Sequence, residues 1–288
     1  MTILVTTPNG AVGRYVTDAL RGRGDVRFLV RSESSARALG EVAGEVVRGD
    51  ATHEDDVRAA LDGVDRLFLA HPFAADQLTA ETTLSQAAVE AGVYRIVKLG
   101  AIDFTTDGAE PDNVTRTHTE IVELLRRADV PELTILEPDR FFQNFLPAAP
   151  AIAGGTLADP AGPGARAYVD VRDIAEVAAA ELVAETPVGG SIEITGPQPL
   201  TLAELADHFG TALGTPVEYV DVPMDDAWRA GLAAAGVDPY VIDGLAGLYR
   251  NYHRDGAARI GDGVQRVLGR QPRSIADFTP QLVAAAGA

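Results

Sequence analysis

Two glycines close to the start of the chain have the spacing of a phosphate-binding turn. An apolar run over residues 3–5 leads into Asn9, Gly10 and Gly13. From Val12 onward, apolar residues recur three and four positions apart, which is typical of a helix packed on a sheet. A strand-to-helix turn leaves the first helical N–H groups unpaired and directs the positive end of the helix dipole at a ligand, which favours a pyrophosphate. The predicted contacts are Thr7, Asn9, Gly10, Ala11, Val12 and Gly13.

This turn lacks the first glycine of the usual G-x-x-G-x-x-G pattern, since Thr7 occupies that position. A threonine fits there if the local φ is negative, and its hydroxyl can bond a phosphate. Gly10 would allow the backbone to approach the pyrophosphate, and Gly13 would allow close packing of helix on strand. The flanking strand and helix and a second strand at residues 26–31 are what a βαβ unit requires. We therefore predict a nucleotide-binding turn, the alternative being a purely structural one.

The second strand ends at Arg31, where an NAD-selective protein would carry an Asp or Glu for the ribose. A guanidinium at this position, followed by Ser32, can neutralise and hydrogen-bond a 2′-phosphate. The alternative is a solvated arginine at a strand end. The sequence therefore predicts that NADP(H) is preferred over NAD(H).

Further strand ends supply residues to the same edge of the predicted sheet. Asp50 and Ala51, which follow the third strand, would border the adenine, and the residues at the later strand ends would lie beside the nicotinamide. A polar loop over residues 102–114 follows the fifth strand and has the character of a lid. The cofactor contacts expected at these strand ends are Asp50, Ala51, Ala70, His71, Pro72 and Gly100.

Strands alternate with helices throughout the first half of the chain. Strand patterns cover residues 3–5, 26–31, 45–48, 66–70, 94–99 and 133–136, with helical patterns between them. This alternation predicts an α/β fold of the Rossmann type, in which a doubly wound parallel sheet carries right-handed crossovers. Ligand is then expected at the carboxyl edge of the sheet.

The predicted domain organisation is a dinucleotide-binding domain and a smaller lobe. The NADP-binding domain covers residues 1–146, and residues 166–187, a strand and a helix, return to it. Residues 147–164 have the composition of a Pro- and Gly-rich loop. The rest of 147–288 is predicted to form an α-rich substrate lobe. Its expected elements are a strand at 191–195, a helix opened by a Thr201–Glu204 capping box, a strand at 217–220 and helices near 225–235, 240–255 and 275–286.

The composition argues against several classes of function. A formal net charge of −18 opposes binding to nucleic acid or anionic lipid, because those partners attract clustered Lys and Arg. The absence of cysteine excludes disulfides, thiolate metal sites and a cysteine nucleophile. No signal peptide, membrane span or metal-ligand spacing is recognisable, so we expect no membrane partner and no metal, and the cytoplasm as the default location.

Three segments besides the turn carry a resemblance to a known family: Thr134–Asn144, Val169–Ala175 and Thr195–Pro197. Together they resemble the NmrA-like branch of the atypical short-chain dehydrogenases/reductases over nearly the whole chain. The resemblance implies that the N-terminal domain binds NADP(H) and that a smaller lobe closes a cleft over the nicotinamide. The family contains NAD(P)H:quinone and isoflavone reductase types as well as NADP-sensing regulators, so it implies the fold more specifically than the function.

The chain departs from the family pattern at residues that matter for chemistry. Gly100 stands where strand five often ends in a serine, and the Tyr-x-x-x-Lys pair of typical short-chain dehydrogenases is missing. His118 falls near the place where the family directs a lysine or histidine into the cleft. An ordinary histidine pKa near neutrality suits proton donation to a carbonyl that receives hydride. The alternative is a surface histidine on the exposed face of its helix.

Substrate contacts are expected from two loops and from the small lobe. The resemblance places substrate-facing groups after strand six, where an aromatic wall and an amide suit a flat, partly oxygenated ring. Core packing alone could explain one phenylalanine there. Aromatic residues at helical spacing in the small lobe are more often core or dimer contacts, which leaves a homodimer open. The expected substrate contacts are Phe73, Phe142, Asn144 and Trp228.

These observations favour an NADP(H)-dependent oxidoreductase that reduces a small, aromatic or quinonoid molecule. The cofactor would supply the hydride, while the protein positions the ring and excludes water. Two alternatives stay open: an NADP-sensing regulator without turnover, and a reductase fold reused for non-redox tailoring of a secondary metabolite.

Overall fold

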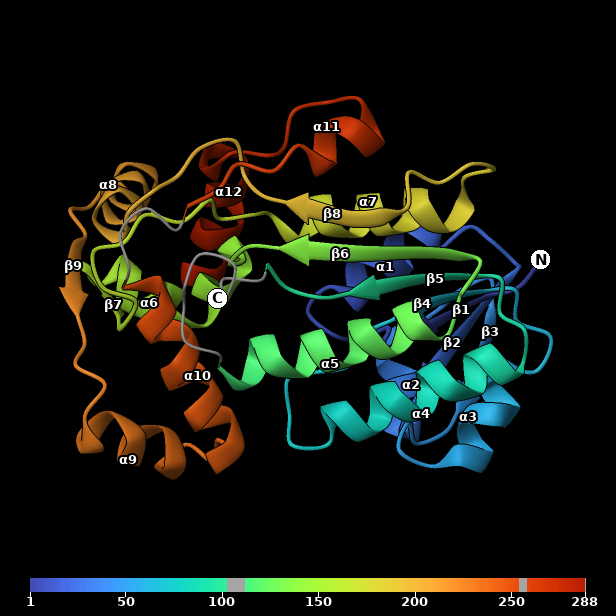
Figure 1. Ribbon diagram of the computed structural model, residues 1–288. Helices are drawn as coiled ribbons and strands as arrows, with labels where there is room; N and C mark the ends of the chain where they lie inside the picture. The colour runs from blue at the N-terminus through green and yellow to red at the C-terminus, as the bar shows by residue number, and fades with distance from the viewer. Residues whose placement is uncertain (103–111, 254–257, 288) are drawn as a thin grey trace.

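The computed structural model describes residues 1–102, 112–253 and 258–287. Its main sheet has seven strands in the order β3-β2-β1-β4-β5-β6-β8, and all neighbours are parallel (Figure 1). The chain moves from β1 outward to β3 and then returns to continue on the other side of β1, which is the doubly wound order that the sequence predicts. The strands are β1 Ile3–Thr6, β2 Val26–Val30, β3 Glu45–Arg48, β4 Arg66–Leu69, β5 Arg95–Leu99, β6 Glu132–Pro138 and β8 Gly190–Ile194.

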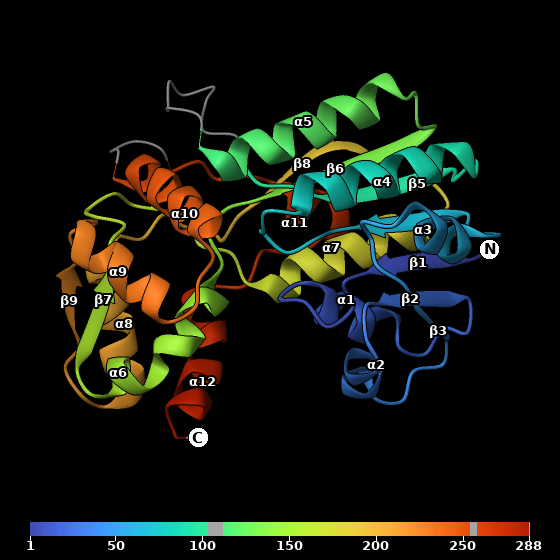
Figure 2. The ribbon, with the colours of Figure 1, turned by 90° about the horizontal axis from the view of Figure 1, so that it is seen from below.

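Helices cover both faces of this sheet (Figure 2). Alternate residues of β1 point to opposite faces, so Ile3 and Val5 join the core beneath α1 and α7, whereas Leu4 joins the core beneath α3, α4 and α5. Both faces of the central strands are therefore apolar, as a parallel sheet requires. The helices of this domain are α1 Gly13–Leu20, α2 Glu33–Leu39, α3 Glu54–Leu61, α4 Gln77–Glu90, α5 Asn113–Arg127, α7 Val171–Val183 and α11 Gly263–Leu268.

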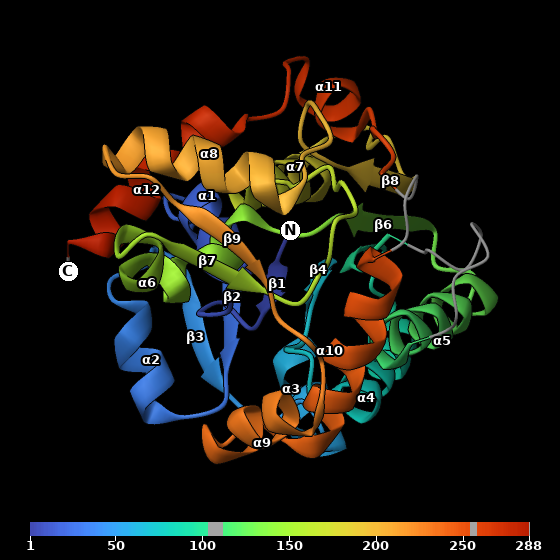
Figure 3. The ribbon, with the colours of Figure 1, turned by 90° about the vertical axis from the view of Figure 1, so that its left-hand side faces the viewer.

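The small lobe lies beyond the carboxyl ends of the main sheet (Figures 1 and 3). Its core is aromatic: Phe142, Phe145, Phe209 and Phe278 are almost fully buried together. A two-stranded parallel sheet, β7 with β9, and the helices η2, α6, α8, α10 and α12 contribute to or enclose this core. The elements of the lobe are η2 Phe142–Ala148, α6 Ala149–Ala153, β7 Thr156–Asp159, α8 Leu202–Leu213, β9 Glu218–Asp221, α9 Asp226–Ala234, α10 Pro239–Tyr252 and α12 Ile275–Ala286.

Three sequence predictions differ from these elements. The strand predicted at 191–195 for the small lobe is β8, which extends the main sheet beside β6. Residues 167–171 form no strand, only an isolated bridge between Phe141 and Val169. The predicted loop at 147–164 contains α6 and β7. The segments that pair, β8, β7 and Val169, have partners that are distant in sequence (β6, β9 and Phe141). The local pattern therefore does not specify which sheet a short apolar segment joins.

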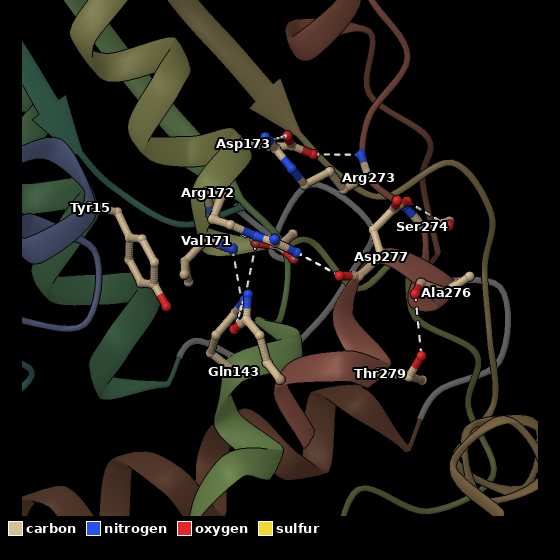
Figure 4. A network of polar contacts seen from close by, with 12 residues as sticks. Tyr15, Gln143, Val171, Arg172, Asp173, Arg273, Ser274, Ala276, Asp277 and Thr279 are labelled. Atoms are coloured by element: carbon tan, nitrogen blue, oxygen red, sulfur yellow. Dashed lines mark hydrogen bonds and ion pairs between the residues drawn. The ribbon is translucent and has the colours of Figure 1, made fainter. Parts of the chain in front are cut away.

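The C-terminal segment is held against the N-terminal domain by polar contacts at the start of α7 (Figure 4). Asp173 is fully buried and accepts hydrogen bonds from the Arg273 backbone N–H at 2.6 Å and from the side chains of Arg270 and Arg273. Arg172 donates to the carbonyl oxygen of Asp277 at 2.8 Å. These contacts hold the start of α12 beside α7 and so connect the two parts of the protein.

Candidate active site

The turn after β1 is tight enough to exclude a side chain at Gly13 and leaves little room for one at Gly10. The Gly10 N–H donates to the carbonyl oxygen of Thr7 at 2.9 Å. A Cβ on Gly13 would lie 2.0 Å from that oxygen, and one on Gly10 would lie 3.1 Å from it. Gly13 is therefore required for packing α1 on the turn. Thr7 itself has φ of 48°, so the expectation of a negative φ is wrong.

A left-handed β-branched residue is strained, which leads to a stability prediction. We expect Thr7→Gly to stabilise the protein by on the order of 1 kcal/mol, because about 1–3 kcal/mol of strain is relieved and about 0.5–1 kcal/mol of chain flexibility is added to the unfolded state. Urea unfolding measures the difference. Asp129→Gly is the matched control at another left-handed non-glycine residue (φ 54°), and its gain should be smaller because Asp tolerates this conformation better. If Thr7→Gly were instead less stable, the 3.3 Å hydrogen bond from the Thr7 hydroxyl to the Ala70 carbonyl oxygen would contribute more to stability than the backbone strain costs.

Two adjoining cavities of about 430 and 330 Å³ form one cleft along the carboxyl ends of the main sheet. The cavities meet at the β1 turn and at the end of β4. Both ends of the cleft therefore share one wall, as the two halves of a dinucleotide site would. The residues that line both cavities are Thr7, Gly10, Ala70, His71 and Pro72.

The smaller cavity contains most of the residues predicted for the adenosine half. Arg31 is exposed at its rim, and Asn9, Asp50 and Ala51 line it. Hydrogen bonds from the Thr52 hydroxyl and N–H lower the pKa of Asp50. Thr52 is thereby bonded to Asp50, and His53 is the residue that precedes α3.

Ser32 does not line this cavity, which corrects its assignment as a cofactor contact. Its hydroxyl accepts a hydrogen bond from the Ser35 N–H at 3.1 Å and so caps α2. Ser35 lines the cavity in its place, and the Asn9 amide donates to the Ser35 carbonyl oxygen at 2.7 Å. The serine-rich sequence predicted a polar cluster, but it did not indicate which hydroxyl faces the cleft.

The larger cavity contains the residues predicted beside the nicotinamide and several that sequence reasoning missed. Ala11, Val12, Gly13 and Gly100 line it, as does Phe73. The missed residues come from the start of α4, from the end of β5 and the residues after it, from the loop after β6, and from α10. Those of α10 are so distant in sequence that no pattern indicated them. The missed residues are Gln77, Leu99, Ile102, Asp139, Arg140, Leu245, Leu248 and Tyr252. Most of the predicted lid, residues 103–111, lies outside the described residues.

His118 lines this cavity from α5 and is only partly exposed, so the surface alternative is wrong. Its Nδ1 lies 3.2 Å from Nζ of Lys98. Burial, and then the positive charge of Lys98, lower the pKa of His118 well below its ordinary value. The sequence argument relied on a pKa near neutrality, and that premise is wrong, because burial and Lys98 favour the neutral imidazole over the imidazolium.

Of the two expected substrate contacts in the loop after β6, one faces the cavity and the other is buried in the small-lobe core. Asn144 is exposed and lines the cavity, and so does Phe141. Phe142 is 1% exposed and stacks on Tyr168 and Phe278 in the small-lobe core, so its assignment to substrate is wrong. Trp228 also does not line the cavity and instead contacts Tyr249 edge-on.

A buried arginine closes the small-lobe end of the cavity. Arg140 is 6% exposed and makes a two-pronged ion pair with Asp159, whose Oδ1 accepts from Nη1 at 3.1 Å. Burial opposes the charge, but Asp159 and nearby tyrosines hold the pKa of Arg140 well above its ordinary value. Because its charge is neutralised by Asp159, Arg140 shapes this wall rather than offering a free cation to an anionic ligand. The rings that surround the guanidinium are Phe145, Tyr168, Tyr249 and Tyr252.

The described ranges contain no cluster of three His, Asp or Glu side chains arranged to hold a metal ion. Among the helices of these same ranges, none combines the length and apolar composition that crossing a membrane requires. The β1 turn, by contrast, fits a dinucleotide: Gly10 lies at the junction of the two cavities, and α1 begins at the same point.

Comparison with known proteins assigns this arrangement to a family. The model of the NmrA-like family matches residues 1–254. An NAD(P)H azoreductase of Xenophilus azovorans is 32% identical over 290 residues, which cover 99% of each chain. A (4-alkanoyl-5-oxo-2,5-dihydrofuran-3-yl)methyl phosphate reductase of Streptomyces griseus is 33% identical over 283 residues, covering 97% of each chain.

Solved structures agree on the fold. The NADPH-dependent quinone oxidoreductase 2 of Escherichia coli, crystallised with NADPH, superposes with a TM-score of 0.81 at 24% sequence identity, and the match covers 98% of this chain and 99% of that one. The same Rossmann-type sheet and added lobe are therefore present in both proteins.

Proposed function

This chain belongs to the NmrA-like family, and from that premise we propose that it is an NAD(P)H-dependent reductase of small, flat, aromatic or quinonoid acceptors. The observation that carries the proposal is the single cleft: one cavity fits the adenosine half of a dinucleotide, and the adjoining one is lined mainly by apolar side chains. The names of the relatives, an azoreductase and a quinone oxidoreductase, support the same class of acceptor.

Each part of the cleft has a role in this proposal. The turn from Thr7 to Gly13 holds the pyrophosphate, and the bound dinucleotide supplies the hydride. Phe73 and Phe141 enclose a flat ring and exclude water, while Asn144 and His118 offer hydrogen bonds to its oxygen or nitrogen atoms. Few polar groups in a mostly apolar cavity suit an uncharged acceptor.

The deciding experiment follows oxidation of NADPH in the presence of a panel of quinones, azo dyes and enones, with binding of NADPH measured separately by calorimetry. Turnover with at least one acceptor is the expected result. Tight NADPH binding without reduction of any acceptor would favour the regulator or the non-redox alternative. A pulldown of protein partners separates those two.

We further propose that NADPH is preferred over NADH because of Arg31, which lies at the rim of the adenosine cavity. A charge-assisted hydrogen bond to the 2′-phosphate should be lost in Arg31→Ala, weakening NADPH binding roughly tenfold to hundredfold and leaving NADH binding unchanged. Calorimetry with both cofactors measures this. Arg37→Ala removes an arginine of α2 that does not line the cavity and serves as the control. Equal affinities of the wild-type protein for NADPH and NADH would contradict the proposal.

A further inference from the structure

Behind the nicotinamide end of the cleft lies a buried ion pair that the proposed function does not use. Glu81 of α4 and Lys98 of β5 are both fully buried, with Oε2 and Nζ 2.8 Å apart. Lys98 is the only lysine in the chain, where every other basic side chain of this length is arginine. The other carboxylate oxygen, Oε1, accepts a hydrogen bond from the Gln77 amide at 3.3 Å.

The geometry around Lys98 determines which nitrogen of His118 carries a proton. The Nζ group contacts three acceptors: the Glu81 carboxylate, the Leu99 carbonyl oxygen and Nδ1 of His118. An ammonium has three donors and no acceptor, so Nδ1 must be the unprotonated nitrogen. The neutral ring therefore carries its hydrogen on Nε2. A planar guanidinium, with donors that fork in one plane, would not match these three acceptors.

We propose that Glu81 and Lys98 are positioning residues that hold His118 as a neutral Nε2–H donor, and that Lys98 replaces the proton His118 gives to the reduced acceptor. This inference rests on the proposed reductase function. It differs from the sequence prediction, in which His118 was an acid because of its own ordinary pKa.

The proton balance of this relay closes with one proton from solvent. Once the acceptor has received hydride, the electron pair displaced onto its oxygen or nitrogen takes the proton from Nε2. Nδ1 then takes a proton from Nζ, which leaves a neutral amine beside the Glu81 carboxylate. After product leaves, water in the cavity protonates Nε2, and the Nδ1 proton returns to Lys98.

Burial makes Lys98 a competent donor in this relay. Desolvation lowers its pKa, which favours release of a proton, and the Glu81 carboxylate 2.8 Å away opposes that shift. Other charged or titratable groups line the cavities that His118 faces. They are His71, Asp139 and Arg140 across the cavity, and Glu123, Arg126 and Glu137 around a smaller pocket of about 110 Å³ that His118 also lines.

The first test needs no turnover. In cofactor-free protein labelled with ¹⁵N-histidine, the signal of His118 is identified by its absence from the His118→Gln spectrum. The ring should show the Nε2–H tautomer and stay neutral at pH values below its ordinary pKa. In Glu81→Gln/Lys98→Met, which removes the pair without leaving one charge unpaired, His118 should titrate closer to its ordinary pKa of about 6.5. A wild-type ring with its proton on Nδ1 would overturn the proposal even if no variant folds.

The second test measures turnover. Both His118→Gln and Glu81→Gln/Lys98→Met should lower kcat on the order of 10²-fold with little change in KM. Arg95→Met/Glu132→Gln removes an ion pair between the buried Arg95 and the partly buried Glu132 at the opposite end of β5 and should leave the tautomer of His118 unchanged. Full kcat in the Glu81/Lys98 variant would contradict the relay alone, whereas a wild-type protein that reduces no acceptor would contradict the proposed function.

Discussion

Gly10→Val is expected to weaken NADPH binding by about a hundredfold or more, because a branched side chain would stand where the pyrophosphate meets the β1 turn. Loss of one or two hydrogen bonds to a charged phosphate, each worth about 1.5–3 kcal/mol, accounts for this effect. Gly10 lies at the junction of the two cavities, so any side chain there projects into the path between them. Calorimetric titration with NADPH measures the affinity directly.

The fold should survive this substitution better than the same change at Gly13. A Cβ on Gly10 would lie 3.1 Å from the Thr7 carbonyl oxygen, which small shifts can accommodate, whereas the 2.0 Å approach at Gly13 cannot be relieved without moving α1. Gly22→Val is the control, because a Cβ there meets nothing within 4 Å. NADPH binding by Gly10→Val with wild-type affinity would mean that the turn has only a structural role.

Phe142→Ala is expected to destabilise the protein by about 3–5 kcal/mol, the usual cost of removing a large ring from a packed core. The Phe142 ring lies 5.4 Å from that of Phe278 and 5.8 Å from that of Tyr168, centroid to centroid, and no part of it faces the cleft. The expected result is therefore a lower free energy of unfolding, measured with urea. Binding of acceptors to the folded variant should change little.

Its neighbour provides the matched comparison. Phe141→Ala removes a half-buried ring that lines the cavity, so it should raise KM for flat acceptors while costing much less stability. If Phe142→Ala instead raised KM without affecting unfolding, the side chain would have to face the cleft, as the sequence alone suggested.

The sequence by itself determined the features that depend on residues close together in the chain. The spacing of Gly10 and Gly13 between an apolar run and a helical pattern located the turn, and the alternation of strands and helices specified the parallel α/β class. The position of Arg31 at a strand end also follows from this register, and Arg31 does line the smaller cavity. The match of the NmrA-like family model confirms the resemblance carried by the later motifs.

Only the tertiary structure decided which side chains face the cleft. Phe141 and Phe142 are adjacent and chemically identical, and the packing of Phe142 on Phe278 of α12 sends one ring into the core and leaves the other at the cavity. The left-handed φ of Thr7 is imposed by the closed turn, against the preference of a β-branched residue. The pKa of His118 is lowered by burial and by Lys98, which comes from a strand outside its own helix. Local patterns report the propensities of neighbouring residues, whereas charge, burial and side-chain direction at a site depend on partners that meet only when the chain has folded.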